Sequence, residues 1–243
     1  MPQSTLIVFS GIDGAGKSTQ IELVLARLRQ DGQRPHYLWT RGGYTPLFEG
    51  LKALLRRLPG RAVPPSGHTS QRTRAFGKGW VRRLWLSMAL LELFWVYGVK
   101  VRWWRWRGQF IVCDRYLWDT LVDFRINFPQ ERVERWLLWR FLTRLTPKPD
   151  AAFLLLVPVE ESVRRSDIKD EPFRDPPDVL AQRLAQYQTL ADETGAWHVL
   201  DGQRPIDELA AEIATILNRS GVNAGQGPRK QPVPLIGERG DGA

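Results

Sequence analysis

The fold of this chain is indicated by the stretch Gly11-Ile12-Asp13-Gly14-Ala15-Gly16-Lys17-Ser18-Thr19, which follows the apolar run Leu6-Ile7-Val8-Phe9. The stretch matches the pattern G-x-x-x-x-G-K-[ST] of a loop that joins a strand to a helix and binds phosphates. Its glycines lack the Cβ atoms that would block a tight turn, so successive backbone N–H groups converge on the phosphates of a nucleotide. We therefore predict that all nine residues, 11 to 19, bind ATP.

Two side chains of this loop have chemistry of their own. Lys17 is predicted to reach the β- and γ-phosphate oxygens as a catalytic residue, and the Ser18 hydroxyl is predicted to bind Mg²⁺. The helix that begins here directs the positive end of its dipole at the same phosphates. The alternative, a glycine-rich turn without function, is disfavoured because strand, loop and apolar helical pattern occur in the required order.

A second motif, Asp114-Arg115-Tyr116, ends the apolar strand predicted at residues 110–113. In a chain with a phosphate-binding loop, an acid at the carboxyl end of a strand is expected to complete the site for a magnesium nucleotide. We predict that Asp114 holds Mg²⁺ through water. The alternative is that Asp114 only caps the strand end or forms a turn.

Strands and helices alternate along the chain, which predicts an α/β fold. We expect a three-layer P-loop NTPase fold with about five parallel strands, helices on both faces and a short lid. One kinase domain is expected over residues 1–218, with a mobile basic loop at 61–80, a lid at 160–175 and a disordered tail at 219–243. The expected strands are 6–9, 36–39, 110–113, 152–157 and 197–200, and the expected helices include 47–58, 159 onward, 179–193 and 206–217, with further helices between 130 and 145.

The positive charge is concentrated in one segment. The chain has a net charge of +9, while residues 50–113 contain thirteen Lys or Arg and a single acid, Glu92. Such a segment attracts an anionic substrate, a nucleic acid or an acidic membrane surface. Within it, residues 84–99 are too few to span a bilayer and are expected to form a buried core helix. The adjoining Trp103-Trp104-Arg105-Trp106-Arg107 leaves contact with a membrane surface as an alternative.

Residues 160–175 begin as a helix and become a charged segment that Pro172 ends. If this segment closes over bound phosphates, Arg164 and Arg165 are candidates for neutralising the transferred group, which makes them predicted catalytic residues. The neighbouring acids also allow an ordinary solvated helix with internal ion pairs.

The single cysteine, Cys113, excludes an intrachain disulfide and a cysteine-rich metal site. Because residues 1–4 lack a basic stretch and the following apolar run is short, no signal peptide is expected. The protein is therefore expected to be cytoplasmic.

The two phosphate-site motifs, the segment Thr40-Arg41-Gly42-Gly43-Tyr44-Thr45-Pro46 and the arginine-containing lid before Tyr187 resemble the thymidylate kinases over residues 4–218. The resemblance implies a Mg²⁺-dependent transfer of the ATP γ-phosphoryl group to a nucleoside monophosphate, dTMP, by a homodimer. It also implies an acceptor site made by Asp13, Arg41, Arg115 and Tyr116, in which Asp13 approaches the sugar and Arg115 clamps the phosphate as a catalytic residue.

The chain differs from the family pattern on the side of the acceptor base. Ser10 replaces the usual glutamate, and Asp119 and Asp123 follow the second motif where small residues and tyrosine are usual. These differences leave two alternatives. One is a kinase for another small acceptor on the same scaffold, and the other is a nucleotide-controlled protein that docks on a membrane or nucleic acid through residues 50–113.

Overall fold

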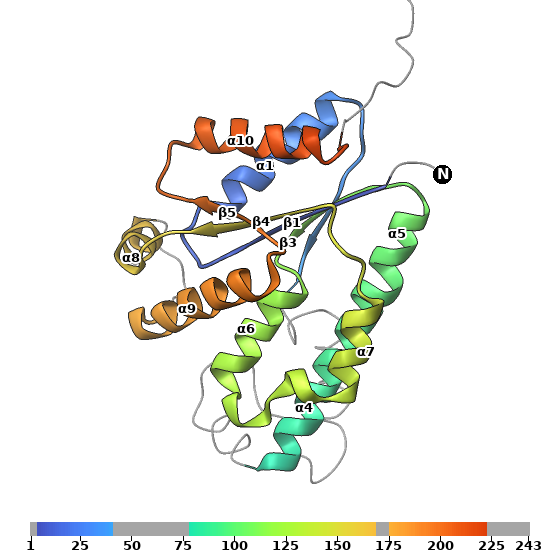
Figure 1. Ribbon diagram of the computed structural model, residues 1–243, viewed down its shortest axis with the longest axis vertical. Helices are drawn as coiled ribbons and strands as arrows, with labels where there is room; N and C mark the ends of the chain where they lie inside the picture. Colours follow the sequence, from blue (N-terminus) through green and yellow to red (C-terminus); the bar gives the residue numbers. More distant parts are fainter. Residues whose placement is uncertain (1–3, 41–77, 169–174, 223–243) are drawn as a thin grey trace, which may run out of the picture.

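Five parallel strands form the centre of the molecule (Figure 1). The structure is a computed structural model, and it describes residues 4–40, 78–168 and 175–222. The strands lie in the order β2-β3-β1-β4-β5, and every neighbouring pair is parallel. The expected five-stranded parallel sheet is therefore confirmed. Its strands are β1 (Thr5–Gly11), β2 (His36–Trp39), β3 (Phe110–Asp114), β4 (Ala151–Leu156) and β5 (His198–Asp201).

Helices cover both faces of the sheet, which gives the three layers that were predicted. Helices α1 and α10 lie together on one face, while α6, α9 and the long helical segment that contains α4 and α5 lie on the other (Figure 1). The helical elements are α1 (Lys17–Gln30), α4 (Gly79–Leu93), the π-helix η1 (Phe94–Val101), α5 (Arg102–Trp106), α6 (Leu117–Asn127), the 3₁₀ turns η2 (Pro129–Glu131) and η3 (Val133–Arg135), α7 (Leu137–Leu145), α8 (Val159–Ile168), α9 (Pro177–Thr194) and α10 (Ile206–Arg219).

Strand order decides which residues meet at the carboxyl edge of the sheet. β1 lies between β3 and β4, and all of its residues are buried. In the β1–β3 register Phe9 lies opposite Asp114, so the loop after β1 and the turn after β3 leave the sheet side by side. Two motifs about one hundred residues apart in sequence thereby share one edge, where ligands bind in sheets of this kind.

The continuous helix from α4 to α5 was expected to be a buried core helix, but only one of its faces is buried. Leu86, Leu90 and Tyr97 are fully buried, whereas Leu91 and Trp95 are 55% and 53% exposed. The span Gly79–Trp106 is 28 residues long and would be long and apolar enough to cross a membrane, judged by length and composition alone. Because its inner face packs into the core, the same composition also suits a helix of a globular domain.

The structure differs from the predicted helices in two regions. The chain forms α6 directly after the second motif, where no helix was predicted. Between 130 and 145 it forms the short turns η2 and η3 before α7, because Pro129 and the left-handed Arg132, with φ of 42°, interrupt a regular helix. The predicted helix 47–58, Arg41, residues 61–77 of the basic loop, residues 169–174 of the lid and the tail from 223 lie outside the described residues.

Candidate active site

The glycines of the phosphate-binding loop have backbone conformations that only glycine adopts readily. Gly11, Gly14 and Gly16 have φ values of 139°, 72° and 91°. A Cβ atom on Gly11 would lie 2.2 Å from the carbonyl oxygen of Leu155, and one on Gly14 would lie 2.9 Å from that of Ser162. The loop is therefore packed tightly against β4 and α8, and its shape depends on the missing side chains.

Lys17 folds back onto the loop that precedes it. Its Nζ donates hydrogen bonds to the carbonyl oxygens of Gly11 at 3.0 Å and Ile12 at 2.7 Å. Burial, together with the charge of Arg115, lowers the pKa of Lys17 to about 8. The ammonium group is thus held in a place where it is poorly solvated, and an anion bound nearby would stabilise its charge.

A polar cavity of about 180 Å³ lies over Lys17 and brings the two motifs together. Arg115 contributes to its wall from a left-handed turn, with φ of 71°. One guanidinium nitrogen, Nη2, donates to Asp13 Oδ1 at 2.6 Å, whereas Nη1 is buried and has no hydrogen-bond partner among the described residues. A buried donor without an acceptor is costly, so an anion that reached Nη1 from this cavity would remove that cost.

Asp114 and Ser18 line the same cavity, and their carboxylate and hydroxyl oxygens are suitable ligands for Mg²⁺. Asp114 Oδ2 accepts a hydrogen bond of 3.3 Å from Tyr37, whose pKa is raised to about 12 by burial and by Asp114. Asp114 Oδ1 is buried without a partner within the part of the chain that is described. One carboxylate and one hydroxyl are sufficient protein ligands for Mg²⁺, which takes its remaining ligands from water and substrate phosphates.

A second cavity, of about 260 Å³, lies on the other side of the loop, and residues 14–16 form a wall of both cavities. Leu155, Ile168 and Leu209 give this second cavity an apolar lining. Arg165 and Arg204 also line this cavity. The loop therefore has a polar cavity on one side and a more apolar one on the other.

The structure distinguishes the two predicted lid arginines. Arg165 Nη1 donates to the carbonyl oxygens of Gly14 at 3.2 Å and Gly202 at 3.0 Å, so its guanidinium touches the phosphate-binding loop. Arg164 is 62% exposed and pairs only with Glu161 in the interactions described. Hydrogen bonds from Arg164 and Arg165 lower the pKa of Glu161 to about 2.

Tyr116, a predicted acceptor-site residue, is not among the residues that line the polar cavity. Its side chain is 3% exposed, and its hydroxyl donates to the carbonyl oxygen of Pro147 at 2.9 Å. Its ring lies 4.4 Å from that of Tyr97. Its side chain therefore packs in the hydrophobic core.

Two buried polar clusters behind the polar cavity were not identified from the sequence. In one, Asp119 accepts hydrogen bonds from Ser10, Tyr187 and the backbone N–H of Tyr116. The sequence feature that could have indicated this cluster is the spacing of a capping box, in which Asp119 stands three residues after the N-cap residue Tyr116.

In the other cluster, the buried Arg183 of α9 pairs with Asp123 of α6 and with Asp175. No local pattern pointed to this pairing, because its members come from separate segments.

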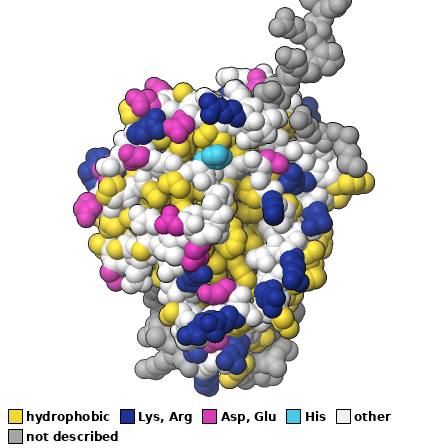
Figure 2. All heavy atoms as spheres, in the orientation of Figure 1, with side chains coloured by type: hydrophobic (Ala, Val, Ile, Leu, Met, Phe, Trp, Pro, Cys, Tyr) yellow, Lys and Arg dark blue, Asp and Glu magenta, His cyan; other side chains and the backbone are white. Residues whose placement is uncertain are grey.

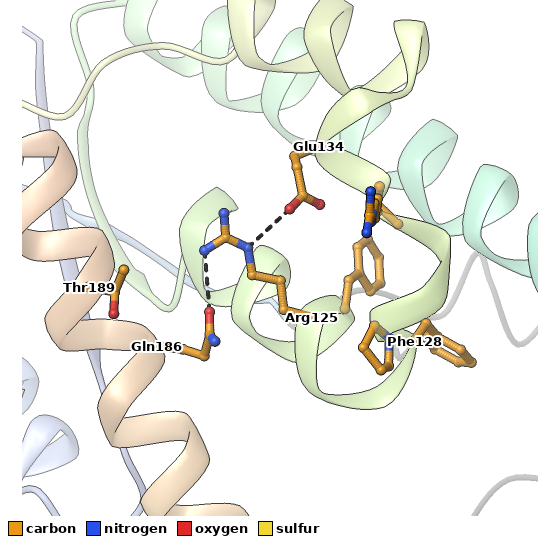
Figure 3. A pocket seen from close by; sticks show the side chains of 9 residues that line it. Arg125, Phe128, Glu134, Gln186 and Thr189 are labelled. Atoms are coloured by element: carbon orange, nitrogen blue, oxygen red, sulfur yellow. Dashed lines mark hydrogen bonds and ion pairs between the residues drawn. The ribbon is translucent and has the colours of Figure 1, made fainter.

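A third cavity, of about 280 Å³, lies between α6, η3 and α9, away from the phosphate-binding loop (Figure 3). Arg125 crosses it, with Nε 3.4 Å from Glu134 and Nη1 3.2 Å from Gln186 Oε1. These polar groups therefore satisfy one another, and we assign no role in the active site to this cavity.

Comparison with known proteins agrees with the geometry. A family model described as thymidylate kinase matches residues 102–213. The chain is 33% identical over 218 residues to the thymidylate kinase of Thermomicrobium roseum, covering 86% of this chain and 92% of the relative. It is 30% identical over 214 residues to the thymidylate kinase of Rhodopirellula baltica, with 87% and 79% covered. A probable thymidylate kinase of Methanothermobacter thermautotrophicus is 26% identical over 211 residues, with 87% and 93% covered.

Proposed function

Because the chain belongs to the thymidylate kinase family, we propose that it transfers the γ-phosphoryl group of ATP to dTMP, giving ADP and dTDP. The observation that carries this proposal is the pair of cavities that share residues 14–16 as a wall. A donor nucleotide on one side and an acceptor phosphate on the other would meet at the loop, where the backbone N–H groups converge.

The donor would lie on the side of the apolar cavity. The adenosine part would pack on Leu155 and Leu209, while its phosphates bind the loop over residues 11–19. Lys17 would exchange its two carbonyl contacts for phosphate oxygens, which provide a full negative charge. Arg165 would leave its carbonyl contacts in the same way and stabilise the transferred group, whereas Arg164 would stay in solvent.

The acceptor would lie in the polar cavity. Arg115 offers Nη1 to a phosphate while Nη2 is held by Asp13, and the Asp13 carboxylate could then also approach the sugar. Arg41 remains a proposed acceptor ligand by its position in the family motif. Tyr116 is proposed only to support the turn that presents Arg115.

Magnesium would be held by Ser18 and, through water, by Asp114. The ion would neutralise charge on the β- and γ-phosphates. Burial of Asp114 Oδ1 without a described partner supports this assignment.

The test is ADP release by the purified protein with Mg-ATP and a panel of deoxy- and ribonucleoside monophosphates. We expect turnover with dTMP, loss of activity in Lys17→Ala, and a fall of at least tenfold in kcat in Arg165→Ala. Arg164→Ala is the matched control, because it removes the neighbouring guanidinium that does not touch the loop; we expect near-normal activity. Turnover of dTMP by Lys17→Ala at the normal rate would refute the proposal.

A different acceptor on the same scaffold is the second candidate. It is favoured by Asp119 and Asp123, which stand where the family usually has small residues and tyrosine, and which are hydrogen-bonded within the protein. Activity on a sugar or nucleoside, with none on dTMP or dUMP, would support this candidate over the first.

Docking on an anionic surface is a further candidate. Helices α4, η1, α5 and α7 carry seven Arg or Lys and one acid, the buried Glu92. Trp80, Trp103 and Trp106 are 62%, 46% and 78% exposed beside these cations. Figure 2 shows basic and hydrophobic side chains side by side on the right, in the region of α5 and α7. Salt-sensitive binding to anionic vesicles or oligonucleotides would support docking, and no binding at low salt would refute it.

We also propose a homodimer, from the family resemblance, and a cytoplasmic location, from the sequence features at residues 1–9. Light scattering at micromolar concentration and cell fractionation would test them. A monomer, or protein found only with membranes, would contradict these proposals.

A further inference from the structure

Asp119 is a fully buried carboxylate at the start of α6, with 1% of its surface exposed. Its Oδ2 accepts hydrogen bonds of 2.7 Å from both the Ser10 hydroxyl and the Tyr116 N–H, and its Oδ1 accepts one of 2.6 Å from the Tyr187 hydroxyl. Burial raises the pKa of this carboxyl above its ordinary value, and Arg115 and the three hydrogen bonds offset only part of that rise. A carboxylate in this place is therefore sustained by contacts with three separate elements, β1, the turn after β3 and α9.

These contacts link Asp119 to Arg115 in two ways. The N–H that it binds belongs to Tyr116, the residue that follows Arg115, so Asp119 fixes the end of the left-handed turn. Its negative charge also acts on the Arg115 guanidinium. The backbone N–H of Arg115 donates to the Phe9 carbonyl oxygen at 2.8 Å, and Nη2 donates to Asp13. Nη1 is buried without a partner among the described residues, and Arg115 lines the polar cavity.

We propose that Asp119 is a positioning residue for Arg115, and that the reaction requires a buried carboxylate at this place rather than an aspartate at this position in the chain. The inference rests on the proposed function, in which Arg115 binds the acceptor phosphate. The carboxylate holds the turn through the Tyr116 N–H and adds to the negative charge that Asp13 already places beside the guanidinium, so Arg115 is held at the wall of the polar cavity before the acceptor arrives. Preorganisation of this kind lowers the cost of binding and of reaching the transition state.

The contact with Ser10 provides a way to move the carboxylate from α6 to β1. Ser10 Oγ lies 2.7 Å from the Asp119 carboxylate, with 109 residues between them in the sequence. A glutamate side chain extends about two bonds beyond a serine hydroxyl oxygen, which spans roughly this distance. The double variant Ser10→Glu/Asp119→Ser therefore returns a carboxylate to the same space, with the serine hydroxyl as its partner.

The experiment compares four variants with the full-length protein. Asp119→Asn keeps the shape and removes the charge. Its Oδ1 can accept from Ser10 and Tyr116 and its amide N–H can donate to Tyr187 Oη, so the one hydrogen bond lost is that donated by the Tyr187 hydroxyl. We expect the variant to raise KM for the acceptor about tenfold or more, because the three hydrogen bonds to Asp119 lose the carboxylate charge and the turn that carries Arg115 is held less firmly. KM for ATP is expected to stay within about twofold. Asp119→Ser is expected to be worse, and Ser10→Glu alone is expected to be impaired by two facing carboxylates. The double variant is expected to recover to within about threefold of the unmodified protein.

Tyr187→Phe is the matched control, because it removes one hydrogen bond and leaves the carboxylate charge in place. It is expected to lower the melting temperature with little change in KM for the acceptor. An unchanged acceptor KM in a folded Asp119→Asn protein, or an equal rise for ATP, would overturn the inference. If the double variant does not fold, the kinetics of Asp119→Asn decide.

A readout without substrate separates this inference from the proposed function. The Nε–H signal of Arg115, observed by ¹⁵N NMR and assigned with Arg115→Lys, should shift or broaden in Asp119→Asn and return in the double variant. If the unmodified protein phosphorylates no nucleotide while this pattern is found, the proposed function fails and the positioning role stands. If dTMP is phosphorylated and the Arg115 signal does not respond, the positioning role fails alone.

Discussion

Replacing Arg183 by methionine is expected to destabilise the protein by about 3–5 kcal/mol. Arg183 is 1% exposed, and its guanidinium pairs with Asp123 on α6 and with Asp175 immediately before α9. Methionine fills a similar volume along the aliphatic part of the side chain, so the main loss is the charge rather than the packing. The variant leaves two carboxylates close together without the guanidinium that balances them.

The magnitude follows from the burial of the pair. A buried charge whose partner is removed loses its counter-charge and hydrogen bonds but does not regain full hydration, which costs about 3–5 kcal/mol. Nearby acidic groups, Asp123 foremost, hold the pKa of Arg183 above its ordinary value although burial opposes its charge. The guanidinium therefore stays charged at any pH at which the protein is folded.

The assay is urea unfolding followed by far-UV circular dichroism at pH 7.5. Arg204→Met is the matched control, because Arg204 pairs with two glutamates of α10 but is 38% exposed; we expect a loss of about 1 kcal/mol or less. The double variant Arg183→Met/Asp123→Asn should recover at least about 1 kcal/mol relative to the sum of the single variants, since it removes both members of the buried pair.

Two results would refute the reasoning. One is a loss below about 1 kcal/mol for Arg183→Met, which would mean that the pair is hydrated or flexible in solution. The other is strict additivity with Asp123→Asn, which would mean that the two side chains do not interact.

Three further predictions concern the active site. Gly202→Ala should weaken ATP binding at least tenfold by calorimetry, since its Cβ would lie 2.7 Å from the Ala15 carbonyl oxygen and 2.8 Å from Val157 Cγ1; wild-type affinity would show that these neighbours yield easily. The pKa of Lys17 is lowered from 10.5 to about 8 in the nucleotide-free protein, so the unfolded chain binds more protons between these values and stability should rise with pH over that window. Urea unfolding at pH 7.5 and 10 measures this rise, and Lys17→Met should show a smaller one; equal slopes would contradict the lowered pKa. Removal of Mg²⁺ with EDTA should abolish turnover, and Ser18→Ala should require a higher Mg²⁺ concentration for half-maximal rate, whereas an unchanged requirement would remove Ser18 from the metal site.

The sheet was predictable because its strands are marked locally. The runs at Leu6–Phe9 and His36–Trp39 carry their own strand signal, and the helices between them leave only parallel pairing. Helix α6 was missed for the opposite reason. Seven of its eleven residues are buried, on more than one side, so it lacks the two-faced pattern by which a helix is predicted.

The phosphate-binding loop could be predicted from sequence because its chemistry needs contiguous residues. Converging N–H groups come from consecutive peptide units, and Lys17 follows at a fixed distance along the chain. The two arginines at 164 and 165 could not be told apart in the same way. Which of two neighbouring helix positions faces the loop depends on how α8 packs, and that packing directs Arg165 to Gly14 and Gly202.

The sequence by itself determined the class of the fold, the loop that binds phosphates and the acid and arginine that follow β3, because each is specified by neighbouring residues. Only the tertiary structure decided that Tyr116 packs in the core, that Arg165 touches the loop, and that Asp119 joins Ser10 to Tyr187 behind Arg115. The physical reason is distance along the chain. These contacts join residues 31 to 151 positions apart, so they depend on strand order and helix packing. Strand order and helix packing follow from the burial of the whole core rather than from any local pattern.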